Sequence, residues 1–118
     1  MYDFVEKELT EVLPLLPTGV QYGKFTQNVA NTLLARLYLN AEVYTGTPQW
    51  QKCIDACEKV SGYSLTPDYK ANFFIKNETS PEIIFAIPYD HKQGTVGNYL
   101  ASMTYHYNQK LAFSADGS

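Results

Sequence analysis

Apolar and polar residues alternate with helical spacing along the first half of the chain. The first such stretch runs from Asp3 to about Leu13, where apolar positions repeat every three or four residues and Pro14 then interrupts the pattern. Asp3 and Glu6 have the three-residue spacing of a capping box, which predicts that the helix begins at Asp3. The chain is therefore predicted to open with an amphipathic helix.

The longest pattern predicts a second helix from Thr26, its expected N-cap, to about Tyr44. Apolar side chains cover most of the circumference of this helix, so neighbouring elements are expected to enclose it on most sides. The connection that follows it is short and contains the sequence "TGT".

A third helix is predicted over residues 48–61, with Thr47 as its cap, Pro48 in its first turn and Gly62 after its end. A short connection between two amphipathic helices predicts that they form an antiparallel hairpin. One continuous stripe is expected to face the second helix; its members are Trp50, Cys53, Ile54, Cys57 and Val60.

Two cysteines in this stripe raise the question of a reactive or metal-binding site. Cys53 and Cys57 lie on the same helix face, but stacking along a helix axis gives poor geometry for a disulfide. A metal site would need two more ligands, and the two histidines, His91 and His106, lie elsewhere in the chain without metal-binding spacing. We therefore predict no metal site and favour packing over reactivity for both cysteines and for Trp50.

Helical periodicity ends after Gly62. Pro67 and Asp68 predict a turn, and "YKANFF" predicts a single helical turn that buries Phe73 and Phe74. The apolar run "EIIFAIP" predicts a buried strand over residues 83–87, followed by a polar loop with glycines. The predicted fold class is mainly α, with one short strand and irregular loops.

Composition and charge exclude several functions. The chain has 118 residues, the size of one domain, and a formal net charge of -3 without a basic run, which argues against nucleic-acid binding. No apolar run approaches a membrane span, so the chain itself is expected to be soluble. Ser102, His106 and Asp116 form no recognisable catalytic arrangement, and "GTVGN" lacks the ending of a phosphate loop. We predict no enzyme and no cofactor.

Tyrosines concentrate near the carboxy-terminal end, in "PYDHKQGTVGNYLASMTYHYN". Aromatic faces can stack on the CH faces of sugar rings, while amide and carboxylate groups can bind the hydroxyls. Covering the helices beneath is an equally plausible role for each tyrosine alone. The candidate glycan-binding residues are Tyr89, Asp90, Asn98, Tyr99, Tyr105 and Tyr107.

Several longer motifs carry a family resemblance. "LARLY" matches the core of the first helix in a tetratricopeptide repeat. The succession "TLLARLYLNAEVYTGTPQWQKCIDACEKV", "YSLTPDYKANF", "NETSPEIIFAIPYD" and "TYHY" resembles the SusD/RagB family in order and spacing, over nearly all 118 residues. One departure is Asn28, which stands where a glycine is common in the family and could hinder close helix approach.

This resemblance implies antiparallel helical hairpins of tetratricopeptide type, stacked as an α-α superhelix. It implies a glycan-binding lipoprotein of the Bacteroidetes cell surface, held at the outer membrane by a lipid anchor and serving a SusC-like TonB-dependent transporter. Residues 1–118 would form a single partial domain from the middle of such a protein. The alternative is a helical-repeat scaffold that binds another protein without contacting sugar.

Overall fold

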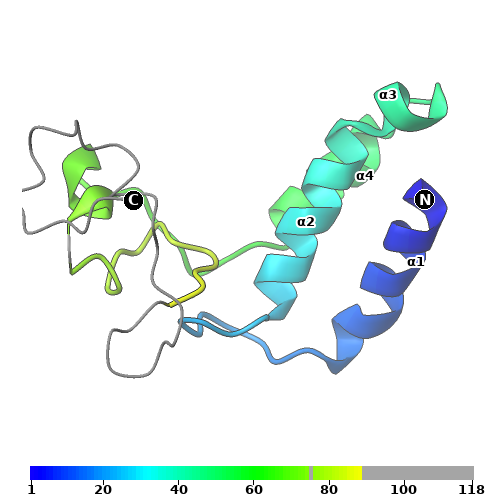
Figure 1. Ribbon diagram of the computed structural model, residues 1–118. Coiled ribbons are helices and arrows are strands. Elements are labelled where there is room, and N and C mark those ends of the chain that lie inside the picture. Colours follow the sequence, from blue (N-terminus) through cyan, green and yellow to red (C-terminus); the bar gives the residue numbers. More distant parts are fainter. Residues whose placement is uncertain (75, 89–118) are drawn as a thin grey trace, which may run out of the picture. The chain divides into compact units, whose positions relative to one another are not determined.

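A computed structural model describes residues 1–74 and 76–88. The described part is mainly helical, which confirms the mainly α character of the predicted fold (Figure 1). Its first compact unit covers Met1–Ala86. The elements are α1 (Tyr2–Val12), η1 (Leu13–Leu15), α2 (Gln27–Leu39), α3 (Ala41–Thr45), α4 (Trp50–Glu58) and η2 (Tyr69–Phe73).

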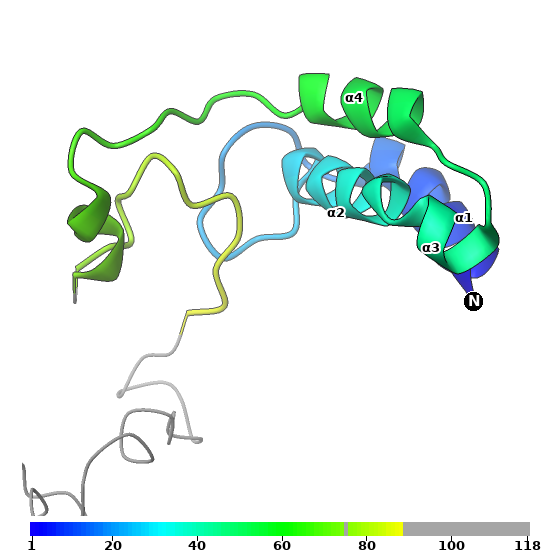
Figure 2. The same ribbon diagram turned by 90° about the horizontal axis from the view of Figure 1, so that it is seen from above.

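Helices α2 and α4 lie side by side and run in opposite directions (Figures 1 and 2). At one end, the Asn28 side chain in the first turn of α2 donates to the Ser61 carbonyl (3.0 Å) and accepts from the Ser61 N–H (3.3 Å). At the other end, the Lys52 ammonium lies 5.3 Å from the ring centre of Tyr38. Asn28 therefore does not keep the two segments apart: its amide joins them.

The core lies between these two helices and α1. Its buried members are Leu34, Ala35 and Tyr38 of α2 and Ala56 of α4. Two of the four are alanines, and small side chains allow two helix backbones to approach closely. The partly buried side chains packed against this core come mainly from α1 and η1; they are Tyr2, Leu9, Leu13 and Cys53.

The first helix begins one residue earlier than predicted. Met1 is the N-cap of α1, and no side chain caps the helix, so the predicted capping box is wrong. Asp3 lies inside the first turn, where a carboxylate still interacts favourably with the helix dipole. Glu6 does not reach back to the helix start; its side chain pairs with Lys52.

The second predicted helix is divided in two. Thr26 is the N-cap of α2, as predicted, although its side chain makes no capping hydrogen bond. The helix leaves α geometry at Asn40 (φ -99°, ψ 7°), and α3 then continues for one short turn before Gly46, whose φ of 76° ends it. The Asn40 side chain donates to the Arg36 carbonyl (2.8 Å), a local bond that competes with regular helix.

The third predicted helix starts two residues late and is rotated. Helix α4 begins at Trp50 with Gln49 as N-cap, so Thr47 is not its cap. Ala56 is its buried residue, and Cys53, one turn before it, is half-buried. Trp50 and Ile54 are about half exposed (49% and 51%).

The predicted buried stripe is thus right for Cys53, and Val60 is also half-buried. It is wrong for Trp50, Ile54 and Cys57, which are exposed. The residue of α4 that is buried with the core side chains of α2 is the small Ala56 instead.

The predicted strand over residues 83–87 is wrong. Within residues 1–74 and 76–88 there is no strand; an extended segment becomes one only when a neighbouring segment supplies a hydrogen-bonded ladder. This segment is held by isolated contacts, such as the Tyr63 hydroxyl donating to the Ile84 carbonyl (3.5 Å) and the edge-to-face rings of Phe25 and Phe85 (6.0 Å).

Candidate functional site

The six candidate glycan-binding residues, Tyr89, Asp90, Asn98, Tyr99, Tyr105 and Tyr107, lie outside the residues that the structure describes. Three other groups of side chains in the described part have functional potential. They are a polar cluster between the helices, the cysteine pair on α4, and an aromatic pair in the turn segment, which we define as residues 62–86.

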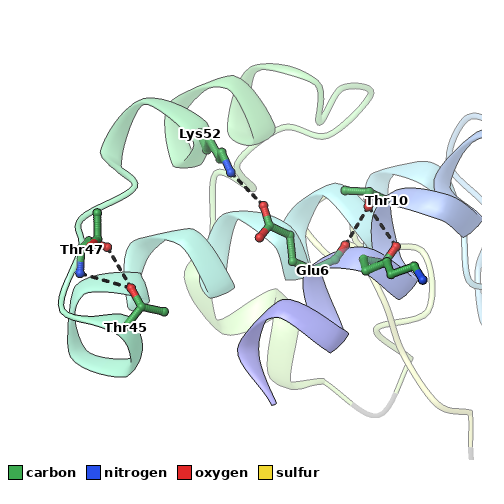
Figure 3. A network of polar contacts seen from close by, with 6 residues as sticks. Glu6, Thr10, Thr45, Thr47 and Lys52 are labelled. Atoms are coloured by element: carbon green, nitrogen blue, oxygen red, sulfur yellow. Dashed lines mark hydrogen bonds and ion pairs between the residues drawn. The ribbon is translucent and has the colours of Figure 1, made fainter.

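The polar cluster joins α1, α2 and α4. The Lys52 ammonium donates to Glu6 Oε1 at 2.9 Å, across 46 residues of sequence (Figure 3). The same ammonium lies over the ring of Tyr38, which is a cation-π arrangement. The Tyr2 hydroxyl is buried without a hydrogen-bond partner. This cluster connects the amino-terminal helix to both members of the α2–α4 pair.

The electrostatics of this cluster argue against acid-base catalysis. The hydrogen bond from Lys52 lowers the pKa of the Glu6 carboxyl and raises the pKa of the Lys52 ammonium. Burial, followed by the nearby Glu6 carboxylate, raises the pKa of Tyr38 to about 12. At neutral pH these groups are therefore a permanent ion pair beside a neutral phenol, whereas a general base needs a pKa near the working pH.

The two cysteines of α4 differ in their exposure to solvent. Cys53 is half-buried and Cys57 is exposed. Burial, followed by the neighbouring Cys57, raises the pKa of the Cys53 thiol, so it is mostly protonated at neutral pH. A catalytic cysteine has the opposite character, because the thiolate is the nucleophile. In the described part of the chain, no three histidine, cysteine, aspartate or glutamate side chains gather to hold a metal ion.

The aromatic pair is formed by Tyr69 and Phe73 at the two ends of η2. Their ring centres are 5.1 Å apart and the ring planes meet at 56°. Both side chains are largely exposed, Tyr69 by 73% and Phe73 by 70%. Phe74, directly after η2, is 58% exposed, so the expectation that Phe73 and Phe74 are buried is wrong.

A network of polar side chains holds η2 in place. The Asp68 carboxylate accepts a hydrogen bond from the Lys70 N–H (3.0 Å) and caps the turn. The Glu82 carboxylate accepts from the Thr66 N–H and, at 2.9 Å, from the Asn72 side chain. These bonds, the one from Thr66 first, lower the pKa of Glu82, which is therefore charged at neutral pH. The network fixes the segment from which both rings project.

Apolar side chains also line an open groove of about 460 Å³ between α1 and α2. Two charged side chains, Glu8 and Arg36, are also among its lining residues. Its other lining residues are Phe4, Val5, Leu9, Leu33, Leu37, Asn40 and Tyr44. This composition suits contact with another apolar surface better than it suits catalysis.

Comparison with known proteins relates the chain to a sugar-binding protein. Over 99 aligned residues it is 35% identical to the starch-binding protein SusD of Bacteroides thetaiotaomicron. The chain belongs to the SusD-like family. The match takes in 76% of this chain and 18% of SusD, so the chain spans less than a fifth of that relative's length. No protein-family profile matches the chain.

For this SusD-like chain, sequence reasoning missed the exposed rings of Tyr69 and Phe73. Their four-residue spacing directly after "TPD" was the available signal, because a proline and an aspartate start a short exposed turn rather than a buried helix. Among the described helices of this SusD-like chain, none has the length and apolar character that a membrane crossing requires.

Proposed function

We propose that this SusD-like chain is part of a protein that binds glycans and does not cleave them. The observation that carries this proposal is the sequence relation to a protein named for starch binding. The described side chains agree with binding rather than catalysis, because the raised pKa values of the Tyr2 and Tyr38 phenols and of the Cys53 thiol favour their neutral forms.

We further propose that the chain is a middle segment of a longer protein at the outer surface of the outer membrane. That protein would be held by a lipid anchor and would pass its sugar to a SusC-like TonB-dependent transporter. The antiparallel α2–α4 pair, with α1 against it, would be one unit of a tetratricopeptide-like superhelix. Close packing of α2 and α4 around small residues supports this arrangement.

The test is affinity electrophoresis of the full-length protein in gels that contain starch or another polysaccharide. We expect retardation in at least one gel and unchanged mobility of a non-binding reference protein. Retardation of the wild type would then allow the candidates Tyr89, Asp90, Asn98, Tyr99, Tyr105 and Tyr107 to be replaced one at a time by alanine. Loss of retardation with a native circular dichroism spectrum would assign a residue to the site.

A second candidate function is a scaffold that binds another protein, and the apolar groove between α1 and α2 favours it. Unretarded migration in every glycan gel, together with firm association with a transporter in detergent, would contradict the glycan proposal and support the scaffold.

A further inference from the structure

We infer that Tyr69 and Phe73, which were not among the candidate residues predicted from the sequence, form a stacking surface for a pyranose ring. This inference rests on the proposed glycan-binding function and assigns a surface that would contact the sugar. Four observations support the assignment: the exposure of the two rings, their mutual angle, the polar groups beside them and the network that holds them.

Exposure is the first observation. Two neighbouring aromatic side chains that are 73% and 70% exposed leave a large apolar area in water. When a ligand covers such apolar area, its removal from water contributes about 25 cal/mol per Å² to the binding free energy. A pyranose ring offers a matching surface, because its axial C–H groups form an apolar face while its hydroxyls project around the rim.

The geometry of the pair is the second observation. With ring centres 5.1 Å apart and planes at 56°, the two rings do not stack on each other's faces. One ring can therefore lie under the C–H face of a sugar while the other contacts the edge of the same sugar. Tyr69 also brings a hydroxyl, which can donate to or accept from a sugar hydroxyl.

The neighbouring polar groups are the third observation. Asp68 and Lys70 flank Tyr69 in the chain, and both are exposed. A carboxylate accepts hydrogen bonds and an ammonium donates them, so together they match the mixed donor and acceptor character of sugar hydroxyls.

Rigidity is the fourth observation. The Glu82 carboxylate accepts from the Thr66 N–H, before η2, and from the Asn72 side chain, within η2. Asn72 in turn accepts from the Ser80 hydroxyl and, through its backbone carbonyl, from the Asn77 side chain (2.8 Å). A turn that is held before binding loses less conformational entropy when a ligand arrives. The rings are thus presented on a fixed support.

The experiment uses the full-length protein, with starch in affinity gels and maltoheptaose in calorimetric titration. Tyr69→Ala and Phe73→Ala should each weaken binding about tenfold, as expected for the loss of a central aromatic contact. Tyr69→Phe keeps the ring and should retain most of the affinity. Trp50→Ala removes an exposed aromatic side chain on α4 (49% exposed) and should leave binding unchanged.

Hydroxyl-radical labelling, read by mass spectrometry, provides a measurement that does not depend on variants. Both rings should be labelled readily in the free protein and should be protected by saturating maltoheptaose. Rings that are unlabelled before sugar is added, or equally labelled after it, would overturn the assignment.

The outcomes separate this inference from the proposed function. If the wild type binds glycan and the alanine variants bind equally well, the stacking surface is refuted while glycan binding stands. If the wild type binds no glycan in any gel, both are refuted.

Discussion

The helical region, residues 1–61, and the turn segment, residues 62–86, are stabilised in different ways. In the helical region, apolar side chains are buried around Leu34 and Ala56. In the turn segment, no side chain is fully buried among the described residues, and hydrogen bonds to Glu82 and Asn72 hold the chain. The first arrangement resists unfolding through burial, whereas the second fixes a local shape and leaves aromatic rings exposed.

The largest expected effect tests this difference with one substitution made in each region. Leu34→Ala removes a side chain that is 4% exposed, and we expect it to lower the free energy of unfolding by about 2 to 4 kcal/mol. Leu65→Ala in the turn segment removes a side chain that is 87% exposed and should change that free energy by less than about 0.5 kcal/mol.

Urea unfolding of both variants, followed by circular dichroism, gives the comparison. Equal losses of stability for Leu34→Ala and Leu65→Ala would show that the two regions do not differ in burial.

The next effect concerns the junction where α2 meets the end of α4. Asn28→Ala removes the two hydrogen bonds that this buried side chain makes to the Ser61 backbone, at a cost of about 1 to 3 kcal/mol. Asn40→Ala is the matched control, because that exposed side chain bonds only within its own helix. The urea midpoint should be lower for Asn28→Ala than for Asn40→Ala. A larger loss of stability for Asn40→Ala would contradict the assigned role of Asn28.

Hydrophobic spacing predicted the helical region better than the turn segment. The positions of α1, α2 and α4 follow from apolar residues at three-and-four spacing, a local property of the sequence. The face that α4 buries does not follow from this spacing, because apolar residues cover a wide arc of the helix and the residue that is buried is the small Ala56.

In the turn segment, the apolar run over residues 83–87 has the composition of a strand, but a strand also needs a partner, which no local pattern specifies. The placement of η2, which carries Tyr69 and Phe73, likewise depends on Glu82, which bonds to Thr66 and Asn72 across 16 and 10 residues of sequence. The six candidate residues in the tyrosine-rich stretch stay a prediction.

Lowering the pH is expected to have a smaller effect on the free energy of unfolding. The pKa values of Glu6, in the helical region, and Glu82, in the turn segment, are lowered by hydrogen bonds from Lys52 and Thr66 respectively. A carboxyl whose pKa is lower in the folded state stabilises the fold above its unfolded pKa of about 4.5, and that contribution is lost as pH falls through the folded value. We therefore expect the free energy of unfolding to decrease below about pH 4.5.

Variants assign this acid dependence to the two regions. Glu6→Gln removes a pair that joins helices at 2.9 Å and should reduce the pH dependence of global unfolding, by at most about 1 kcal/mol because Lys52 is half exposed. Glu82→Gln should instead increase proteolysis within residues 62–86 at neutral pH while leaving helix unfolding unchanged. Identical effects of both variants on global unfolding would mean that the regions unfold as one unit.

The smallest effect distinguishes two cysteines within the helical region itself. Cys53 packs against the core, so Cys53→Ala should cost about 1 kcal/mol, whereas the exposed Cys57→Ala should cost less than about 0.5 kcal/mol. Thiol labelling gives an independent measure, because Cys57 is accessible and the pKa of Cys53 is raised by burial and by Cys57 itself. Cys57 should therefore react first with iodoacetamide. Equal labelling rates would indicate that both thiols are accessible to solvent. Cys53 would then not pack against the core, and Ala56 would remain as the residue by which α4 is buried.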